Sequence, residues 1–185
     1  HVVGLCVDPF HPALAALLAS QQAGRWQRIA DIDQRLVREG VHGLSEYVRK
    51  QFCDAPGRNH AADFLIDQGM VSDRRQAFRR FLAGKGRLRV EAPWCDIATA
   101  VETIRGAGGI AVLAHPNRYR LSSGKLNRLI EGFTECGGDA MEVSYSNLLP
   151  DQMRNLADRA CKFDLWVSAG SDFHDPDLGW MDIGR

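Results

Sequence analysis

The stretch Gly109-Ile110-Ala111-Val112-Leu113-Ala114-His115-Pro116-Asn117-Arg118 decides the fold class, because a short apolar strand in it runs directly into a histidine and a proline. A second stretch, Leu165-Trp166-Val167-Ser168-Ala169-Gly170-Ser171-Asp172-Phe173-His174, repeats that form with an aspartate and a histidine at its end. Helical patterns near residues 97–106, 125–136 and 151–163 alternate with these strands and with a third one at 139–144. Helices that alternate with short apolar strands predict a parallel α/β sheet or barrel.

The first half of the chain has a different character. Residues 1–7 form an apolar strand pattern, and because a natural protein seldom begins in mid-strand, we expect further sequence before His1. Apolar residues then recur with a 3.6-residue period up to about Glu39 and predict one long helix. Residues 40–93 show short helical patterns separated by Gly and Pro, without an alternating strand. They predict a small helical subdomain inserted between two α/β portions, residues 1–39 and 94–185.

Composition limits the class of protein. A chain of 185 residues with 45% apolar residues can bury the core of one domain. The 23 basic and 23 acidic residues balance, so the whole-chain charge gives no argument for nucleic acid or a membrane surface. Residues 49–89 are locally basic, with ten basic against four acidic residues. Five widely spaced cysteines and the lack of an apolar run near ~18 residues predict a cytoplasmic protein that does not bind membranes.

The ends of the predicted strands hold the residues with chemical potential. Asp172 and His174 lie two positions apart, so in extended backbone both side chains leave the same face and can reach one ion. A carboxylate and an imidazole at this spacing chelate transition metals well. The D-x-H spacing also occurs by chance, and a histidine such as His115 can instead cap a neighbouring carbonyl in a turn. Their joint placement on successive strand ends favours a metal site, since active sites of parallel α/β folds collect at that edge.

Three motifs in order resemble those of the PHP (polymerase and histidinol phosphatase) superfamily: His1-Val2-Val3-Gly4, Ala114-His115-Pro116-Asn117-Arg118 and Gly170-Ser171-Asp172-Phe173-His174. The resemblance spans essentially the whole chain and is strongest to nucleoside 3′,5′-bisphosphate phosphatases and 5′→3′ exoribonucleases of the RNase AM type. It implies a distorted PHP-type β/α barrel that lacks its N-terminal strands here.

The same resemblance implies a ligand set. His1, His115, Asp172 and His174 match metal ligands of the family, and His115, Asp172 and His174 match its catalytic residues. Family members carry up to three divalent ions, with manganese favoured. The family's N-terminal H-x-H, the aspartate after it, a further histidine and a glutamate are not found in these 185 residues, so we expect the chain alone to be inactive. The implied reaction is hydrolysis of a phosphate ester by metal-activated water.

Substrate contacts are predicted at three positions. Arg118 follows His115 closely enough to reach a phosphate, or it forms a surface ion pair. Arg58 and His60 match an R-x-H of the family at the start of an insertion helix, where an anion is also favoured. Glu142, at the end of a strand, is either a partner of a ligand histidine or half of a buried ion pair.

The predicted substrate is a nucleotide or a short 5′-phosphorylated RNA, with no obligate protein partner. Two alternatives remain open. The same fold serves phosphatases of small metabolites such as histidinol phosphate, against which the basic insertion argues mildly. A non-catalytic RNA-binding module with a vestigial metal site would use the basic insertion alone and would bind RNA in a salt-sensitive way without metal.

Overall fold

Two compact units make up the chain in the computed structural model, which describes residues 1–172. The α/β unit comprises residues 1–15 and the part that begins at Cys95, and the helical unit comprises Ala16–Trp94. Among the described residues, no helix is both long and apolar enough to cross a lipid bilayer.

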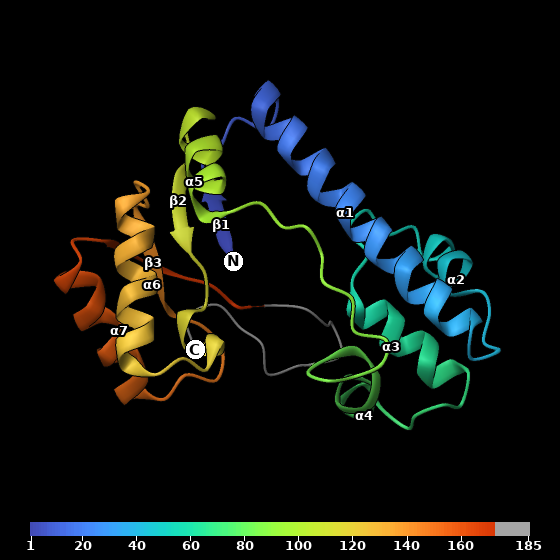
Figure 1. The fold of residues 1–185 in the computed structure, drawn as a ribbon. Helices are drawn as coiled ribbons and strands as arrows, with labels where there is room; N and C mark the ends of the chain where they lie inside the picture. Colours follow the sequence, from blue (N-terminus) through green and yellow to red (C-terminus); the bar gives the residue numbers. More distant parts are fainter. Residues whose placement is uncertain (173–185) are drawn as a thin grey trace. The chain divides into compact units, whose positions relative to one another are not determined.

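The α/β unit contains a four-stranded sheet in the order β1 (Val2–Leu5), β2 (Ile110–Leu113), β3 (Ala140–Ser144) and β4 (Trp166–Ala169). Its helices are α5 (Ile97–Gly106), α6 (Ser123–Glu135) and α7 (Pro150–Lys162), and a 3₁₀ turn, η2 (Pro116–Tyr119), follows β2 (Figure 1). Strand and helix alternate from α5 to β4, as the sequence predicts. Within the described residues the strands form an open sheet.

The direction of β1 differs from the prediction of a parallel sheet. β2, β3 and β4 pair in parallel, whereas β1 runs antiparallel to β2, with Val2 opposite Leu113 and Leu5 opposite Ile110. Helical crossovers make neighbouring strands parallel, but β1 reaches β2 through the whole helical unit and is free of that constraint. As a consequence, the amino end of β1 and the carboxyl ends of β2, β3 and β4 meet at the same edge of the sheet.

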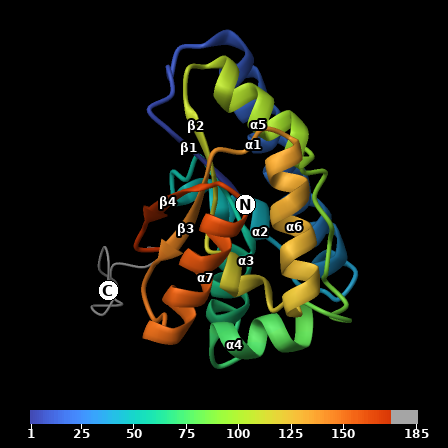
Figure 2. The ribbon, with the colours of Figure 1, turned by 90° about the vertical axis from the view of Figure 1, so that its left-hand side faces the viewer.

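One hydrophobic core holds the α/β unit together. Ala111 and Leu113, which alternate along β2 and so share one face, are buried against α5, α6 and α7. The helices lie beside the strands in both views (Figures 1 and 2). Leu126, Ile130 and Phe133 repeat along α6 at helical spacing and supply its buried stripe. β4 is less covered, with 66% of Trp166 and 61% of Val167 exposed.

The helical unit is built on most of α1 (Pro12–Val37), against which α2 (Leu44–Lys50) and α3 (Arg58–Asp67) pack. The prediction assigned residues 1–39 to the barrel portion and 40–93 to the insertion. Ile29, Ile32 and Leu36 of α1 lie in the core of the helical unit, so the unit begins earlier in the chain. The long helix carries this apolar stripe and therefore belongs mainly to the helical unit.

The last helical segment of this unit contains an irregularity that the sequence pattern did not reveal. The sequence predicted only short helical patterns in this region, and in the structure α4 (Arg74–Ala77) continues as the π-helical turn η1 (Phe78–Leu82). Asp73 caps α4 by accepting a hydrogen bond from the backbone N–H of Gln76 at 2.7 Å. The wider turn brings both Phe81 and Leu82 into the core, where each is almost fully buried.

Candidate metal and phosphate site

Two of the predicted metal ligands face each other at the sheet edge. His1 precedes β1 and His115 follows β2, and the antiparallel pairing of these strands places Nδ1 of His1 2.9 Å from Nε2 of His115. The rings meet edge to face, with centroids 4.8 Å apart. His115 has a left-handed backbone with φ of 33°, which is uncommon for a residue other than glycine. The turn into Pro116 thus directs the imidazole along the edge.

Glu142 holds His115 in this conformation. Its Oε2 accepts a hydrogen bond from the backbone N–H of His115 at 2.6 Å. The carboxylate fits because residue 170 is a glycine, since a Cβ there would lie 2.5 Å from Oε1 of Glu142. Of the two roles left open for Glu142, the structure favours support of a ligand histidine, although the contact is to the backbone and not to the ring.

Asp172 lies beside Arg118. The Nε of Arg118 is 3.2 Å from Oδ2 of Asp172, and Nη2 donates to the carbonyl oxygen of Ser146 at 3.3 Å. Asp172 follows β4 and Arg118 lies in η2 after β2, so this pair joins two strand ends. The ion pair that was the alternative for Arg118 is therefore present. Its partner is the predicted metal ligand, so the guanidinium lies within the candidate site.

Two tyrosines complete the edge, and the sequence reasoning missed both. The hydroxyl of Tyr119 donates to the carbonyl oxygen of Ala114 at 2.7 Å, and the hydroxyl of Tyr145 accepts from the backbone N–H of Asn117 at 3.0 Å. Both rings meet that of His115 edge to face, at centroid distances of 5.5 and 6.5 Å. Tyr145 follows β3 directly, so the strand-end rule that found His115 would also have found it. No comparable signal marks Tyr119.

Burial is the main cause of the pKa shifts of the titratable side chains at this edge. Burial lowers the pKa of His115, while the negative charge of Asp172 acts in the opposite direction and raises it. The dominance of burial favours the neutral imidazole, which is the form that binds metals. Burial also raises the pKa of Tyr145 to about 12 and raises that of Tyr119, with the negative charge of Glu142 adding to both shifts. Both phenols therefore stay protonated and act as hydrogen-bond groups.

The imidazole nitrogens and the carboxylate at this edge are ligand types that suit a divalent metal. The Nδ1 atom of His115 is buried and has no hydrogen-bond partner among residues 1–172, which leaves one ring nitrogen open to a ligand. Within the same range, no three His, Cys, Asp or Glu side chains are gathered closely enough to enclose an ion. His174, the fourth predicted ligand, lies outside the described residues. The structure thus brings His1 and His115 together and places Asp172 at the same edge.

The predicted substrate contacts Arg58 and His60 lie in the helical unit, at the start of α3. Nδ1 of His60 accepts a hydrogen bond from the backbone N–H of Gly57 at 3.1 Å, so this histidine caps its own helix. The guanidinium of Arg58 lies over the ring of Phe78, with Cζ 5.5 Å from the centroid. These contacts fix both side chains locally and leave their role toward a phosphate as a prediction.

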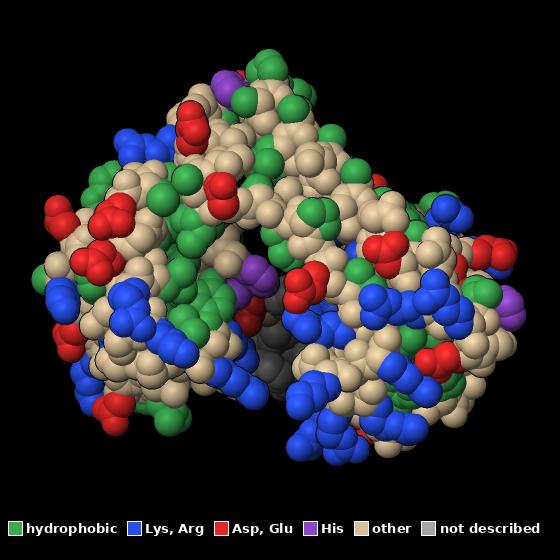
Figure 3. All heavy atoms as spheres, in the orientation of Figure 1, with side chains coloured by type: hydrophobic (Ala, Val, Ile, Leu, Met, Phe, Trp, Pro, Cys, Tyr) green, Lys and Arg blue, Asp and Glu red, His purple; other side chains and the backbone are tan. Residues whose placement is uncertain are grey.

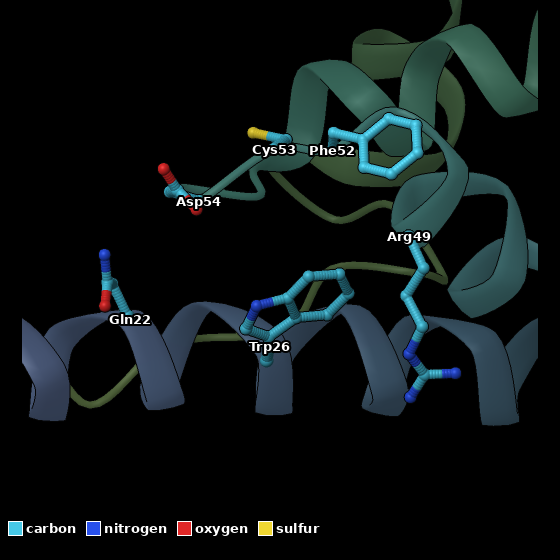
Figure 4. A pocket seen from close by; sticks show the side chains of 6 residues that line it. All are labelled: Gln22, Trp26, Arg49, Phe52, Cys53 and Asp54. Atoms are coloured by element: carbon cyan, nitrogen blue, oxygen red, sulfur yellow. The ribbon is translucent and has the colours of Figure 1, made fainter.

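The helical unit also has a wide hollow between α1 and the end of α2, of about 430 Å³. Trp26 lies below Phe52 in it, with Gln22 and Asp54 at one end and Arg49 at the other (Figure 4). The Phe52 side chain is almost entirely exposed, at 95%. This hollow contains none of the predicted site residues.

Several known proteins are similar to the chain over its full length. A 5′-3′ exoribonuclease of Haemophilus influenzae is 41% identical over 185 residues, which are 100% of this chain and 67% of that protein. A 3′,5′-nucleoside bisphosphate phosphatase of Chromobacterium violaceum is 39% identical over 188 residues, covering 66% of its length. The chain thus spans about two thirds of the length of these relatives. No family model matches it.

Solved structures show the same fold. The structure of an amidohydrolase from Chromobacterium violaceum, with bound sulfate and no metal, superimposes with a TM-score of 0.88 at 36% identity over all of this chain and 66% of its own. A protein named as a metal-dependent phosphoesterase, from Bifidobacterium adolescentis, gives a TM-score of 0.81 at 25% identity with the same coverage. Both agree with a mixed α/β fold that serves hydrolases.

Proposed function

The chain belongs to the PHP superfamily, in the branch of its exoribonuclease and nucleoside bisphosphate phosphatase relatives, and from this premise we propose that the protein hydrolyses phosphate esters of nucleotides or of short 5′-phosphorylated RNA. The observation that carries the proposal is the pair of imidazoles 2.9 Å apart at the edge where four strand ends meet. Dependence on a divalent metal follows the phosphoesterase neighbour, and manganese is the ion we propose.

The residues that would hold metal are His1, His115 and Asp172, together with His174. A divalent ion held by these side chains would supply hydroxide at neutral pH for attack on the phosphate ester, because such ions lower the pKa of water toward ~7. The protein's own part is to hold the ligands. Glu142 fixes the backbone of His115 through its hydrogen bond at 2.6 Å, and Arg118 orients the carboxylate of Asp172. Such supporting contacts tune metal ligands in many proteins.

Arg118 serves the substrate in this proposal as well. Its contacts to Asp172 and Ser146 engage two of its nitrogens, and a guanidinium has five N–H donors in a planar fork. The remaining donors can meet a phosphate oxygen beside the metal ligands. We propose that Arg58 and His60 of α3 contact the substrate phosphate too, which the positive end of that helix supports.

We also propose a complete barrel and a metal cluster like those implied by the family resemblance. The barrel would be completed, and a cluster of up to three ions filled, by the third of the relatives' length that this chain does not match. On this basis we expect the 185 residues alone to be inactive, so the test that follows uses a protein that includes this third. The protein would act in the cytoplasm without an obligate protein partner.

The test compares phosphate release from three substrates with manganese: adenosine 3′,5′-bisphosphate, a short 5′-phosphorylated RNA and histidinol phosphate. We expect release from the first two, abolished by EDTA and by His115→Ala. His42→Ala is the matched control, because His42 is exposed in the segment between α1 and α2. If the protein releases phosphate faster from histidinol phosphate than from the two nucleotide substrates, the proposed substrate class is wrong and the substrate is a small metabolite. RNA binding that is intact in His115→Ala, together with no hydrolysis by the wild-type protein, would establish the non-catalytic module instead.

A further inference from the structure

Phe52 lies at a position where neither burial nor local backbone geometry accounts for a phenylalanine. Gln51 is the C-terminal cap of α2, so Phe52 occupies the next position, where glycine or asparagine is the usual residue. Its φ is 49°, which is uncommon for a residue with a Cβ. Its ring is almost wholly exposed and adds nothing to the core of the helical unit. The aromatic ring is therefore accessible to a ligand.

Trp26 of α1 is the second aromatic side chain of the hollow between α1 and the end of α2. Its half-buried indole packs against the core of the helical unit, which holds the ring in place. Within residues 1–172, the rings of Trp26 and Phe52 make no contact with each other. Both line the hollow of about 430 Å³, with Phe52 above Trp26 (Figure 4). Ligand pockets measure about 300–1,000 Å³, so the hollow can admit a planar ring with an aromatic side chain on each face.

Polar side chains lie at both ends of the hollow. Gln22 and Asp54 lie at one end, where an amide can donate and accept hydrogen bonds and a carboxylate can accept them (Figure 4). They suit the hydrogen-bonding edge of a nucleobase whose flat faces meet the two rings. Arg49 lies at the other end, with Cζ 5.8 Å from the centroid of the Trp26 ring. In the described part of the chain it forms no ion pair, so its charge can meet a phosphate.

The charge around the hollow favours an anion that carries such a ring. Residues 49–89 contain ten basic and four acidic residues, and Lys and Arg side chains gather over the helical unit in the space-filling view (Figure 3). A nucleotide joins an aromatic base to a negatively charged phosphate. Proteins that bind single-stranded nucleic acid combine basic surface with aromatic side chains on which the bases stack. A neutral aromatic ligand would use the two rings but not the charge.

We propose that Trp26 and Phe52 form a nucleobase-binding site, in which one base stacks between the two rings and Arg49 lies beside its phosphate. The base belongs either to an RNA strand or to a free nucleotide, which present the same ring and the same charge. The choice of a nucleotide over other aromatic anions rests on the proposed function. The site is separate from the phosphate contacts proposed for Arg58 and His60, because neither residue lines the hollow, and it needs no metal.

The experiment measures RNA binding in EDTA, where metal-dependent hydrolysis is absent, with the same protein as the activity test. Fluorescence anisotropy compares a labelled short RNA with strands of the same length in which one nucleotide at a time is abasic. The abasic strands keep every phosphate, so a loss of affinity reports the missing base. We expect one abasic position to weaken binding about tenfold, which lies within the range for one base stacked on aromatic side chains.

Phe52→Ala should weaken binding of the intact RNA by the same factor and abolish the effect of that abasic position. Because Phe52 is exposed, the variant should melt as the wild type does. Phe52→Tyr keeps a ring and should retain the affinity, whereas Phe52→Leu keeps an apolar side chain without an aromatic face and should not. Phe10→Ala is the matched control, since Phe10 is 87% exposed and lies in the α/β unit.

Arg49→Gln tests the phosphate contact separately. It should weaken intact and abasic strands equally and make the salt dependence shallower by about 0.7 in log–log slope, the value for one phosphate of a single strand. Lys50→Gln is its matched control, because Lys50 is the next exposed cation and already pairs with Glu46 at 2.8 Å. The source of the base is read from tryptophan fluorescence, which a stacked base quenches in the wild type but not in Trp26→Phe. Such quenching by adenosine 5′-monophosphate identifies a free nucleotide, and quenching by RNA alone identifies a strand.

Three results would overturn the site: equal losses in Phe52→Ala and Phe10→Ala, full affinity in Phe52→Leu, or an effect of the abasic position that persists in Phe52→Ala. Base-dependent binding that needs Phe52, in a protein that releases no phosphate with manganese, would keep this site and reject the proposed function. Phosphate release by a protein whose RNA binding is insensitive to Phe52 would keep the enzyme and reject the site.

Discussion

Replacing Glu142 with alanine should destabilise the α/β unit, because this carboxylate holds the backbone of the predicted metal ligand His115. The hydrogen bond from the His115 N–H to Oε2 is 2.6 Å long and half-buried. A hydrogen bond to a charged group contributes about 1.5–3 kcal/mol, so we expect the free energy of unfolding to fall by about 2 kcal/mol. For a chain of this size that corresponds to a melting temperature lower by roughly 4–8 °C.

A second substitution separates the charge from the hydrogen bond. Glu142→Gln retains an acceptor oxygen at the same position and removes only the charge, so we expect a smaller loss of about 1 kcal/mol. Glu102→Ala is the matched control, since Glu102 is exposed on α5. It removes the same charge without a buried contact.

The assay is urea unfolding followed by circular dichroism, with hydrogen exchange of the His115 amide as the local readout. Glu142→Ala should speed that exchange, whereas Glu102→Ala should leave it unchanged. If Glu142→Ala unfolds at the urea concentration of Glu102→Ala and protects the His115 amide as wild type does, the carboxylate does not support His115. The role assigned to Glu142 in the site would then be refuted.

Three further perturbations test other parts of the molecule. Gly170→Ala should lower the urea midpoint, because its Cβ would lie 2.5 Å from Glu142, whereas Gly132→Ala in α6 meets nothing within 4 Å and should raise stability by about 1 kcal/mol. Asp172→Asn should weaken manganese binding in calorimetry at least tenfold without loss of folding, since Arg118 and a neutral amide still form a hydrogen bond; wild-type affinity would remove Asp172 from the ligand set. Asp96 caps α5 at 2.7 Å from the N–H of Thr99, and this hydrogen bond lowers its pKa in the folded state. Its stabilising effect is therefore complete above the unfolded-state pKa of about 3.9 and is lost as the pH falls through the lower folded-state value. Asp96→Asn should flatten this acid loss in urea melts between pH about 4 and 2, and an unchanged slope would contradict the assignment.

The sequence predicted the rhythm of the α/β unit well, because period and punctuation are local properties of the chain. Gly137-Gly138 and Gly108-Gly109 mark the ends of α6 and α5, and the buried stripe of α6 has a clear helical period. The direction of β1 could not be read in the same way. The direction depends on how β1 pairs with β2, from which it is separated in sequence by the whole helical unit, and no residue in Val2–Leu5 determines it.

The residues of the candidate site likewise differ in whether the sequence alone could predict them. His115 and Asp172 could be predicted from their positions at strand ends, and His1 only from the resemblance to a family. The hydrogen bond that joins Glu142 to the backbone of His115 could not be predicted, because it depends on the register of β2, β3 and β4 and on the absence of a Cβ at residue 170. The sequence left Glu142 open between a partner of a ligand histidine and half of a buried ion pair, and it did not predict a contact to the backbone of His115.

The antiparallel first strand explains why His1, His115 and Asp172 can lie at one edge of the sheet. In a parallel sheet the first residue of a strand lies at the amino edge, away from the residues that follow the other strands. Because β1 is reversed, His1 lies beside His115, whose ring also meets that of Tyr145 after β3. The left-handed backbone of His115, which costs of order 1–3 kcal/mol, is then the local strain that turns its imidazole toward His1. The hydrogen bond from the His115 N–H to Glu142 offsets part of that cost. The strained residue and the side chain that stabilises it therefore lie at the same edge of the sheet.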